Sequence, residues 1–313
     1  MSQNNPSIPY VGLDVAKASL QLDMAGQSHS LTNDAKGHTQ LLKLLRAHPT
    51  AQVVCEATGG YEQPAVRVLH AASVPVSVVE AGRVRHFARA KGQRAKTDPI
   101  DAAMLSEYGQ AMQPSATPAP TAQQTRLAEL SARRRQLLQT RLAESNRAEH
   151  YLDKLCVRQT RQLLRLVDKQ IEACEVAITA LIAADQKLQA KADRLDAIPG
   201  VGAVTAATVL AELPELGRIS DEAAASLAGV APFNRDSGVV TGARHIAGGR
   251  TAVRCALYMA TLSAIRYDAI LKAFYLKLRA AGKKPKVAMV ACMRKLVVLM
   301  NRLLKNEKFQ LAN

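Results

Sequence analysis

Between residues 122 and 195 the chain contains neither glycine nor proline, and this run limits its possible folds more than any other feature. The run is compatible with helix along its whole length. We expect either two helices that fold back near Cys156–Arg161 or one very long rod. A helix of about 30 residues is about 45 Å long, which suits a dimerisation arm. Packing on its own domain is the alternative. Apolar residues recur at heptad spacing, with two further residues at seam positions: Ile171, Cys174, Ile178, Leu181, Leu188 and Leu195, then Asp185 and Ala192.

Ahead of that run, residues 9–112 alternate the patterns of strands and helices. Three short runs of alternating apolar residues predict a three-stranded meander at Tyr10–Val15, Leu20–Met24 and Ser28–Leu31. Further elements are predicted in the order helix 37–47, strand Gln52–Glu56, helix Tyr61–Ala72, strand Val74–Val79, a basic helical segment, and a helix from Asp98. This order is typical of the α/β ribonuclease-H-like (RuvC-like) fold.

The remaining segments complete the predicted organisation. Residues 1–8 are polar and predict a disordered tail without a secretion signal. Residues 113–121 contain three prolines and no charge, as in a linker, and residues 122–196 form the helical arm. Residues 197–313 form a mainly α C-terminal domain that opens with a helix-hairpin-helix-like turn. Its Gly200 and Gly202 expose amides that can bind a phosphate, and a simple packing turn is the alternative.

The charge distribution points to a polyanionic partner. The chain has 42 Lys and Arg against 26 Asp and Glu, a net charge of +16, yet residues 1–80 are slightly acidic. With 7 Tyr, 4 Phe and no Trp, stacking on aromatic side chains does not dominate nucleic-acid binding. Two basic runs are predicted to bind nucleic acid. The first contains Arg83, Arg85, Arg89, Lys91, Arg94 and Lys96, and the second contains Lys283, Lys284 and Lys286. The alternative for the first run is a solvated helix face.

Cysteines and apolar runs predict the compartment. The five cysteines are scattered and have no disulfide or zinc spacing. The most apolar late stretch, Val287 to Met300, is interrupted by Arg294 and Lys295 and is too short to span a bilayer. We expect a reduced, cytoplasmic protein with no membrane partner.

Four acidic residues stand where this fold would place a metal site. Asp14 follows Gly12 in the first strand, and Glu56 ends the fourth. Asp98 and Asp101 are three residues apart, so both can face one point from a helix. Several converging carboxylates can hold two divalent ions about 3.5–4 Å apart. The alternatives are that Asp98 is a helix N-cap before Pro99 and that Glu56 merely ends a strand.

Residues 231–259 are basic and rich in glycine. Ser237 precedes Gly238, and a serine in such a loop is ordinarily a turn residue. The following glycines permit close backbone approach to a ligand. Four side chains there could contact phosphates: Arg244, His245, Arg250 and Arg254.

Together, VGLDVAK, CEATGGY, AKTDPIDAAMLSEY, IPGVG and NRDSG resemble the transposase family of bacterial insertion sequences numbered one-ten, with its eleven-eleven subgroup and the Piv-type DNA invertases. The resemblance runs from about residue 9 to 305. It implies a RuvC-like DEDD domain that binds two Mg²⁺ ions, replaceable by Mn²⁺, through Asp14, Glu56, Asp98 and Asp101. It further implies a coiled-coil arm and a C-terminal domain with Ser237 as the catalytic serine.

The resemblance also implies partners. Family members assemble on DNA as homo-oligomers, either dimers or tetramers, and relatives select donor and target DNA with a structured non-coding bridge RNA. The expected place of action is the bacterial cytoplasm, in association with the nucleoid.

The resulting hypothesis is a recombinase that cleaves and rejoins DNA through a phosphoserine intermediate. One alternative is a Holliday-junction nuclease that uses metal-activated water, and another is a non-catalytic nucleic-acid scaffold. An actin-like sugar kinase ranks last, because its second phosphate loop has no counterpart after residue 121.

Overall fold

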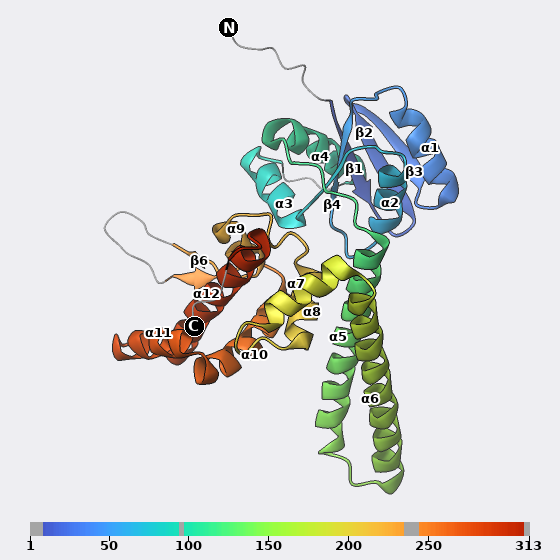
Figure 1. Ribbon diagram of the computed structural model, residues 1–313. Coiled ribbons are helices and arrows are strands. Elements are labelled where there is room, and N and C mark those ends of the chain that lie inside the picture. The colour runs from blue at the N-terminus through green and yellow to red at the C-terminus, as the bar shows by residue number, and fades with distance from the viewer. Residues whose placement is uncertain (1–8, 94–96, 235–243, 310–313) are drawn as a thin grey trace. The chain divides into compact units, whose positions relative to one another are not determined.

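The computed structural model describes residues 9–93, 97–234 and 244–309, and the chain divides into two compact units (Figure 1). Met1–Ala119 form the N-terminal unit and Pro120–Asn313 form the C-terminal unit. The division falls within the predicted linker. The predicted nucleic-acid contacts Arg94 and Lys96, the predicted catalytic Ser237 and the predicted tail of residues 1–8 lie outside the described residues.

A five-stranded mixed sheet forms the centre of the N-terminal unit (Figure 1). The strands are β1 (Tyr10–Val15), β2 (Ser19–Met24), β3 (Gln27–Thr32), β4 (Gln52–Glu56) and β5 (Val76–Val79), in the order β3-β2-β1-β4-β5. β2 is antiparallel to β1 and β3, whereas β4 is parallel to β1 and β5. Its helices are α1 (Ala35–Leu45), α2 (Gln63–Ala71), α3 (Ala81–Ala90) and α4 (Asp98–Met112). The predicted meander and element order are confirmed.

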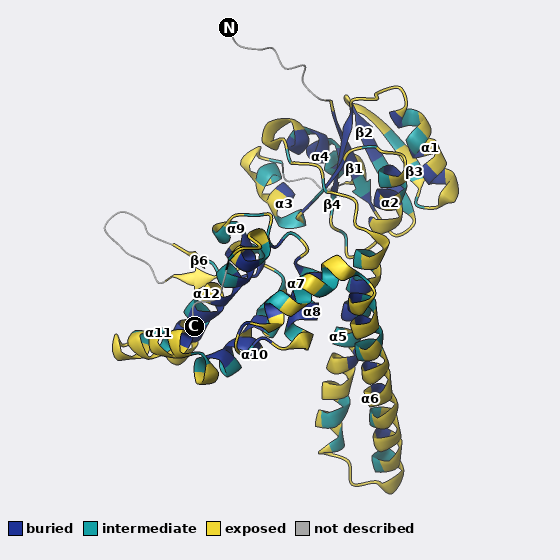
Figure 2. Cartoon of the chain, in the orientation of Figure 1, coloured by how far each residue is buried: buried dark blue, intermediate teal, exposed yellow. Residues whose placement is uncertain are grey.

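Alternation along the strands gives the sheet two apolar faces. Leu13 and Cys55 are fully buried on the face that packs with Leu41 of α1 and Leu69 of α2. The other face carries Val54, which packs with the residues of α3 and α4. Both faces are therefore covered, and Figure 2 shows the strands as the buried centre of this unit.

Helix α4 lies unusually close to β1. A Cβ on Gly12 would lie 1.9 Å from the Ala102 carbonyl oxygen, and one on Gly109 would lie 2.7 Å from the Tyr10 side chain. Ala102 therefore lies over Gly12 and Gly109 over Tyr10, so α4 runs opposite to β1. The first turn of α4 consequently lies toward the carboxyl end of that strand.

The predicted linker is not a free segment along its whole length. Thr117 donates its amide to the Val76 carbonyl at 2.8 Å, and its hydroxyl accepts from the amide of Val78 at 3.0 Å. The side chains of Gln52 and Ser77 both donate to the Pro114 carbonyl. Residues 114–117 are thus fixed along the outer edge of β5.

Two long helices open the C-terminal unit, α5 (Ala122–Ala148) and α6 (Lys154–Ala183), and they pack as a hairpin (Figure 1). The chain folds back at residues 149–153, so the prediction of a turn at Cys156–Arg161 is wrong. The cause is the cap: Asp153 accepts hydrogen bonds from the amides of Leu155 and Cys156 and starts α6 there. Asp185 likewise caps α7 (Gln186–Asp196) and ends the continuous heptad pattern.

The rest of this unit is mainly helical and surrounds α12 (Pro285–Lys305), whose Cys292, Leu296 and Met300 are fully buried. Its elements are α8 (Ala203–Glu212), α9 (Asp221–Leu227), β6 (Pro232–Phe233), β7 (His245–Ile246), α10 (Thr251–Tyr267), α11 (Ala269–Ala280) and α12 (Pro285–Lys305). Across the described ranges, no helix is both long and apolar enough to cross a membrane.

Candidate functional site

Asp14 and Glu56 lie side by side at the carboxyl edge of the N-terminal sheet. Leu13 pairs with Cys55 in the parallel register of β1 and β4, and the two acids follow directly. Both are two residues beyond a position that faces α4, so both lie on the same face of the sheet. Each acid is half-buried.

The second pair of acids occupies the first turn of α4. Asp101 is half-buried and directly precedes Ala102, which lies over Gly12, whereas Asp98 is exposed. The predicted N-cap is wrong by one residue: Thr97 is the N-cap, and its side chain makes no capping hydrogen bond. Asp98 is therefore the first helical residue, where its negative charge interacts favourably with the positive end of the helix dipole. All four acids are thus positioned at one edge of the sheet.

The chemistry of these donors fits a hard divalent cation, because carboxylate oxygens are the ligands preferred by Mg²⁺ and Mn²⁺. Within the described part of the chain, no three His, Cys, Asp or Glu side chains are spaced to hold a metal ion. The acids share an edge without forming a closed coordination group there.

Sequence reasoning missed Glu62, which organises the loop after Glu56. Its buried carboxylate accepts hydrogen bonds from the Thr58 amide and hydroxyl, each at 3.1 Å, and from the Gly60 amide at 2.9 Å. Burial raises the pKa of Glu62, but hydrogen bonds from backbone amides outweigh it and hold the pKa below its usual value. Gly59 and Gly60 both have positive φ, so a glycine pair two residues before an acid was the available signal.

Helix α3 carries the first basic run from the same edge of the sheet. It begins after β5, whose Val79 pairs with Glu56. Its arginines Arg83, Arg85 and Arg89 are exposed. Lys91 is different, because it forms an ion pair with Glu107 of α4. Among the described members of this run, the three arginines are therefore the better placed for a phosphate backbone.

Strands β6 and β7 hold the two ends of the segment that contains Ser237. Pro232 pairs with Ile246 and Phe233 with His245 in antiparallel register. Ser237 itself lies outside the described residues, so its position relative to other groups is not part of the structure.

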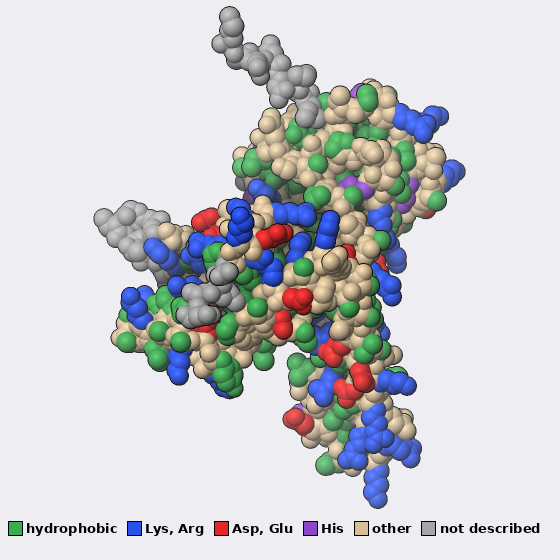
Figure 3. All heavy atoms as spheres, in the orientation of Figure 1, with side chains coloured by type: hydrophobic (Ala, Val, Ile, Leu, Met, Phe, Trp, Pro, Cys, Tyr) green, Lys and Arg blue, Asp and Glu red, His purple; other side chains and the backbone are tan. Residues whose placement is uncertain are grey.

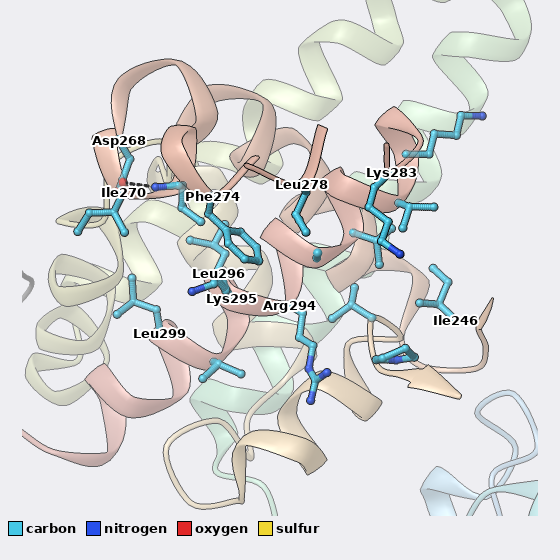
Figure 4. A pocket seen from close by; sticks show the side chains of 18 of the residues that line it. Ile246, Asp268, Ile270, Phe274, Leu278, Lys283, Arg294, Lys295, Leu296 and Leu299 are labelled. Atoms are coloured by element: carbon cyan, nitrogen blue, oxygen red, sulfur yellow. Dashed lines mark hydrogen bonds between the residues drawn. The ribbon is translucent and has the colours of Figure 1, made fainter. Parts of the chain in front are cut away.

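A groove of about 2090 Å³ runs beside this hairpin within the C-terminal unit (Figure 4). Predicted phosphate contacts from distant parts of the sequence line it together: Arg244, His245, Lys283, Lys284 and Lys286. Arg294, Lys295 and Arg302 add three more cations, and Asp268 is the single acid among the described lining residues. Part of the lining is apolar, and there Lys295 lies 4.4 Å from the centre of the Phe274 ring. The groove thus combines cationic and apolar surface.

Known families match both units of the chain. Residues 11–157 match a model described as Transposase, of the DEDD type, and residues 192–276 match the model described as Transposase IS116/IS110/IS902 family. The chain belongs to this transposase family. It is also similar to pilin gene-inverting proteins of Moraxella lacunata and Moraxella bovis, each 28% identical over 303 residues that cover 93% of this chain and 94% of the relative.

Membership of the IS110 transposases makes the chain a DNA recombinase, and its DEDD type implies use of a divalent metal. The sugar-kinase and scaffold interpretations are therefore set aside. The first match runs past the boundary at Ala119 into the C-terminal unit, and the second lies wholly within that unit.

Two of the predicted phosphate contacts of this transposase have internal partners. Arg250 donates to both carboxylate oxygens of Glu215, each at 2.6 Å, and to the Glu212 carbonyl at 2.8 Å. Burial raises the pKa of Glu215, but Arg250 holds it below its usual value. Arg254 donates to the Gly248 carbonyl at 2.7 Å. A phosphate contact by either arginine has to compete with these bonds.

The two glycines of the turn ahead of α8, Gly200 and Gly202, have different surroundings. A Cβ on Gly200 would lie 2.4 Å from the Ala264 amide nitrogen, so this glycine allows α10 to approach. Gly202 has no atom within 4 Å of such a Cβ and stands at the N-cap of α8. Gly202 is therefore the more accessible of the two predicted phosphate contacts.

Proposed function

We propose that this transposase cleaves and rejoins DNA through a phosphoserine intermediate at Ser237, in a reaction that depends on Mg²⁺. The observation that carries the proposal is the common position of Asp14, Glu56 and the first turn of α4 at one sheet edge. A ribonuclease-H-like (RuvC-like) N-terminal domain is part of the proposal. The strand order β3-β2-β1-β4-β5 with an antiparallel β2 supports it.

Asp14, Glu56, Asp98 and Asp101 would hold two Mg²⁺ ions, for which Mn²⁺ can substitute. Bound there, the ions supply Lewis-acid activation of the scissile phosphate and of the attacking hydroxyl. Ser237 Oγ then bonds to phosphorus as a bond from phosphorus to a deoxyribose oxygen breaks. The serine proton leaves to a base, and the departing oxygen takes up a proton. Because the phosphoserine ester conserves the bond energy, another deoxyribose hydroxyl can reverse the step without ATP.

The reaction needs residues from both units, supplied by one chain or by the chains of a homo-oligomer, either a dimer or a tetramer. Requiring the full set of residues makes assembly on the correct DNA a condition for cleavage. The helical arm of residues 122–196 supports an oligomer, because Leu142, Leu155 and Leu166 expose apolar surface along it.

Donor and target DNA and a bridge RNA are the proposed partners, and the bacterial cytoplasm, at the nucleoid, is the proposed location. The cationic groove beside β7 and the arginines of α3 would contact their phosphates. The groove supports this because residues 244–245 line it together with Lys283, Lys284 and Lys286, although the two segments are distant in sequence.

The test is recombination of DNA that carries the junctions flanking this gene, with RNA transcribed from the neighbouring non-coding segment. Asp14→Asn and Glu56→Gln should each reduce recombination by at least about 100-fold, as expected for loss of a metal ligand and its charge. Glu80→Gln is the matched control, because Glu80 follows β5 at the same edge and is exposed. Full activity of Asp14→Asn would contradict the proposal, and products that are cut without rejoining would instead favour the nuclease.

A further inference from the structure

A stripe of cations lies at the far end of the helical arm. Lys154, Arg158, Arg161 and Arg165 follow one another along α6 at spacings of four, three and four residues, which place them on one face of the helix. All four side chains are exposed. We call these four residues the arm-tip stripe. Figure 3 shows blue side chains gathered at this end of the arm.

These cations have no partner in the part of the chain that the structure describes. Within the described ranges, none of the four forms an ion pair or hydrogen bond through its side chain. Two nearby acids are already engaged: Asp168 pairs with Arg141, and Asp153 accepts the first amides of α6. No ion pair within the described ranges therefore neutralises the stripe.

Concentrating like charges here costs stability. Cations three or four residues apart on a helix are neighbours on its surface and repel each other. The stripe also borders a shallow cavity of about 420 Å³, lined with Leu152, Val157 and Gln162 as well as the four cations. Among its described lining residues there is no acid. An anionic partner that neutralises the stripe would remove the repulsion.

The observations favour duplex DNA as that partner. A second copy of the chain could pack on the exposed apolar residues of the arm, but its own stripe would meet this one with like charge, so a copy does not neutralise the stripe. The cavity lining has no aromatic side chain, and single strands depend on aromatic stacking for much of their affinity. The stripe is about 16 Å long, which is enough to meet several phosphates of a duplex, because its two strands together carry one charge per about 1.7 Å of axis.

We propose that the arm-tip stripe is a second, sequence-independent contact of this transposase with the backbone of duplex DNA, separate from the cationic groove beside β7. The proposal rests on the proposed action on DNA, but it uses neither Ser237 nor the carboxylates. It extends the bound duplex to the end of the arm.

The test measures binding of the full chain to a fluorescent duplex of arbitrary sequence across a series of salt concentrations. The variant combines Arg158→Gln, Arg161→Gln and Arg165→Gln. Each lost phosphate contact should reduce the slope of log K against log salt by about 0.9, so the slope should become shallower by about 2 to 3. The matched control combines Lys36→Gln, Lys43→Gln and Arg46→Gln, three exposed cations of α1 and its C-cap, and should change the slope much less.

A triple Arg→Lys variant at the same positions should retain the slope, which separates loss of charge from loss of folding. An unchanged slope in the Gln variant would overturn the proposal. So would lost binding of an RNA hairpin with duplex binding intact, or a changed oligomeric mass in light scattering with duplex binding intact. Ser237→Ala should keep the arm-dependent slope, so failure of the serine mechanism and failure of this proposal give different results.

Discussion

The backbone amide of Gly12 in β1 donates a 2.8 Å hydrogen bond to the hydroxyl of Ser106 in α4. The same hydroxyl lies 3.1 Å from the Asp23 carbonyl in β2, so one buried serine links two strands to the helix. This bond exists only because Gly12 has no side chain. The bond fixes the position of α4 along β1, and therefore the position of its first turn, which carries Asp101.

Gly12→Ala should displace α4. The new Cβ would meet the Ala102 carbonyl oxygen at 1.9 Å, and backbone cannot move aside cheaply. We expect a loss of about 1–3 kcal/mol or more in the free energy of unfolding, together with loss of recombination. Thermal unfolding measures the loss of stability. Gly202→Ala is the control, because its φ is −100° and the space around it is open. Equal melting temperatures for the two variants would contradict this account of the packing.

Glu62→Gln should loosen the loop that follows Glu56. All three donors reach one oxygen, Glu62 Oε2, and the neutral oxygen of a carboxamide accepts hydrogen bonds more weakly than a charged carboxylate oxygen. We expect about 1–2 kcal/mol of destabilisation in denaturant titrations and reduced recombination with DNA binding retained. Glu62→Asp, which keeps the charge on a shorter side chain, is the companion variant. Wild-type stability and activity of Glu62→Gln would show that the loop does not depend on this carboxylate.

The Arg250–Glu215 ion pair should make stability depend on acid pH. The folded-state pKa of Glu215 lies below its ordinary 4.5, so its contribution is present above that value. The stability that this ion pair contributes is lost as the pH falls from 4.5 toward the lower pKa that Glu215 has in the folded protein. Arg250→Gln should cost about 1–2 kcal/mol at neutral pH, discounted for partial exposure.

Urea unfolding at several pH values checks this prediction. The difference between wild type and Arg250→Gln should shrink as the solution is acidified below the ordinary pKa. A difference that stays constant with pH would mean that the charge of Glu215 contributes nothing.

Cysteine reactivity should separate the two units. Burial, with smaller effects of Glu62 and Glu56, raises the pKa of the Cys55 thiol from 9.0 to about 12. Cys255 on α10 is exposed. Iodoacetamide at about pH 8 should therefore modify Cys255 and leave Cys55 intact, as read by peptide mass spectrometry. Because the folded pKa is raised, Cys55 also costs stability as pH rises above 9.0 toward about 12. Rapid labelling of Cys55 in the folded chain would contradict its burial.

Much of the N-terminal unit was predictable because its signals are local. Alternating apolar residues located β1 and β4, and the element order placed Asp14 and Glu56 on neighbouring strands. The role of Glu62 was not predictable in the same way. It depends on three hydrogen-bond donors that meet only after the glycine loop has formed.

In the C-terminal unit, the position of the predicted turn was wrong because a single cap decides it, and the ion pair of Arg250 was not foreseen. Asp153 begins α6 and thereby sets the turn, although the surrounding run is compatible with helix throughout. Arg250 looks like any basic residue of a glycine-rich loop, and only the fold brings Glu215 to it. The groove beside β7 is the converse case, since predicted cations from two separate segments do line one surface.

The central claim is tested most directly by trapping the covalent intermediate. Recombination reactions with junction DNA are stopped in denaturant, and the attached nucleotide is located on the protein by mass spectrometry. The account predicts a DNA adduct on Ser237 in the presence of Mg²⁺, and no adduct for Ser237→Ala although that variant still binds DNA. An adduct that persists in Ser237→Ala, or full recombination by that variant, would contradict it.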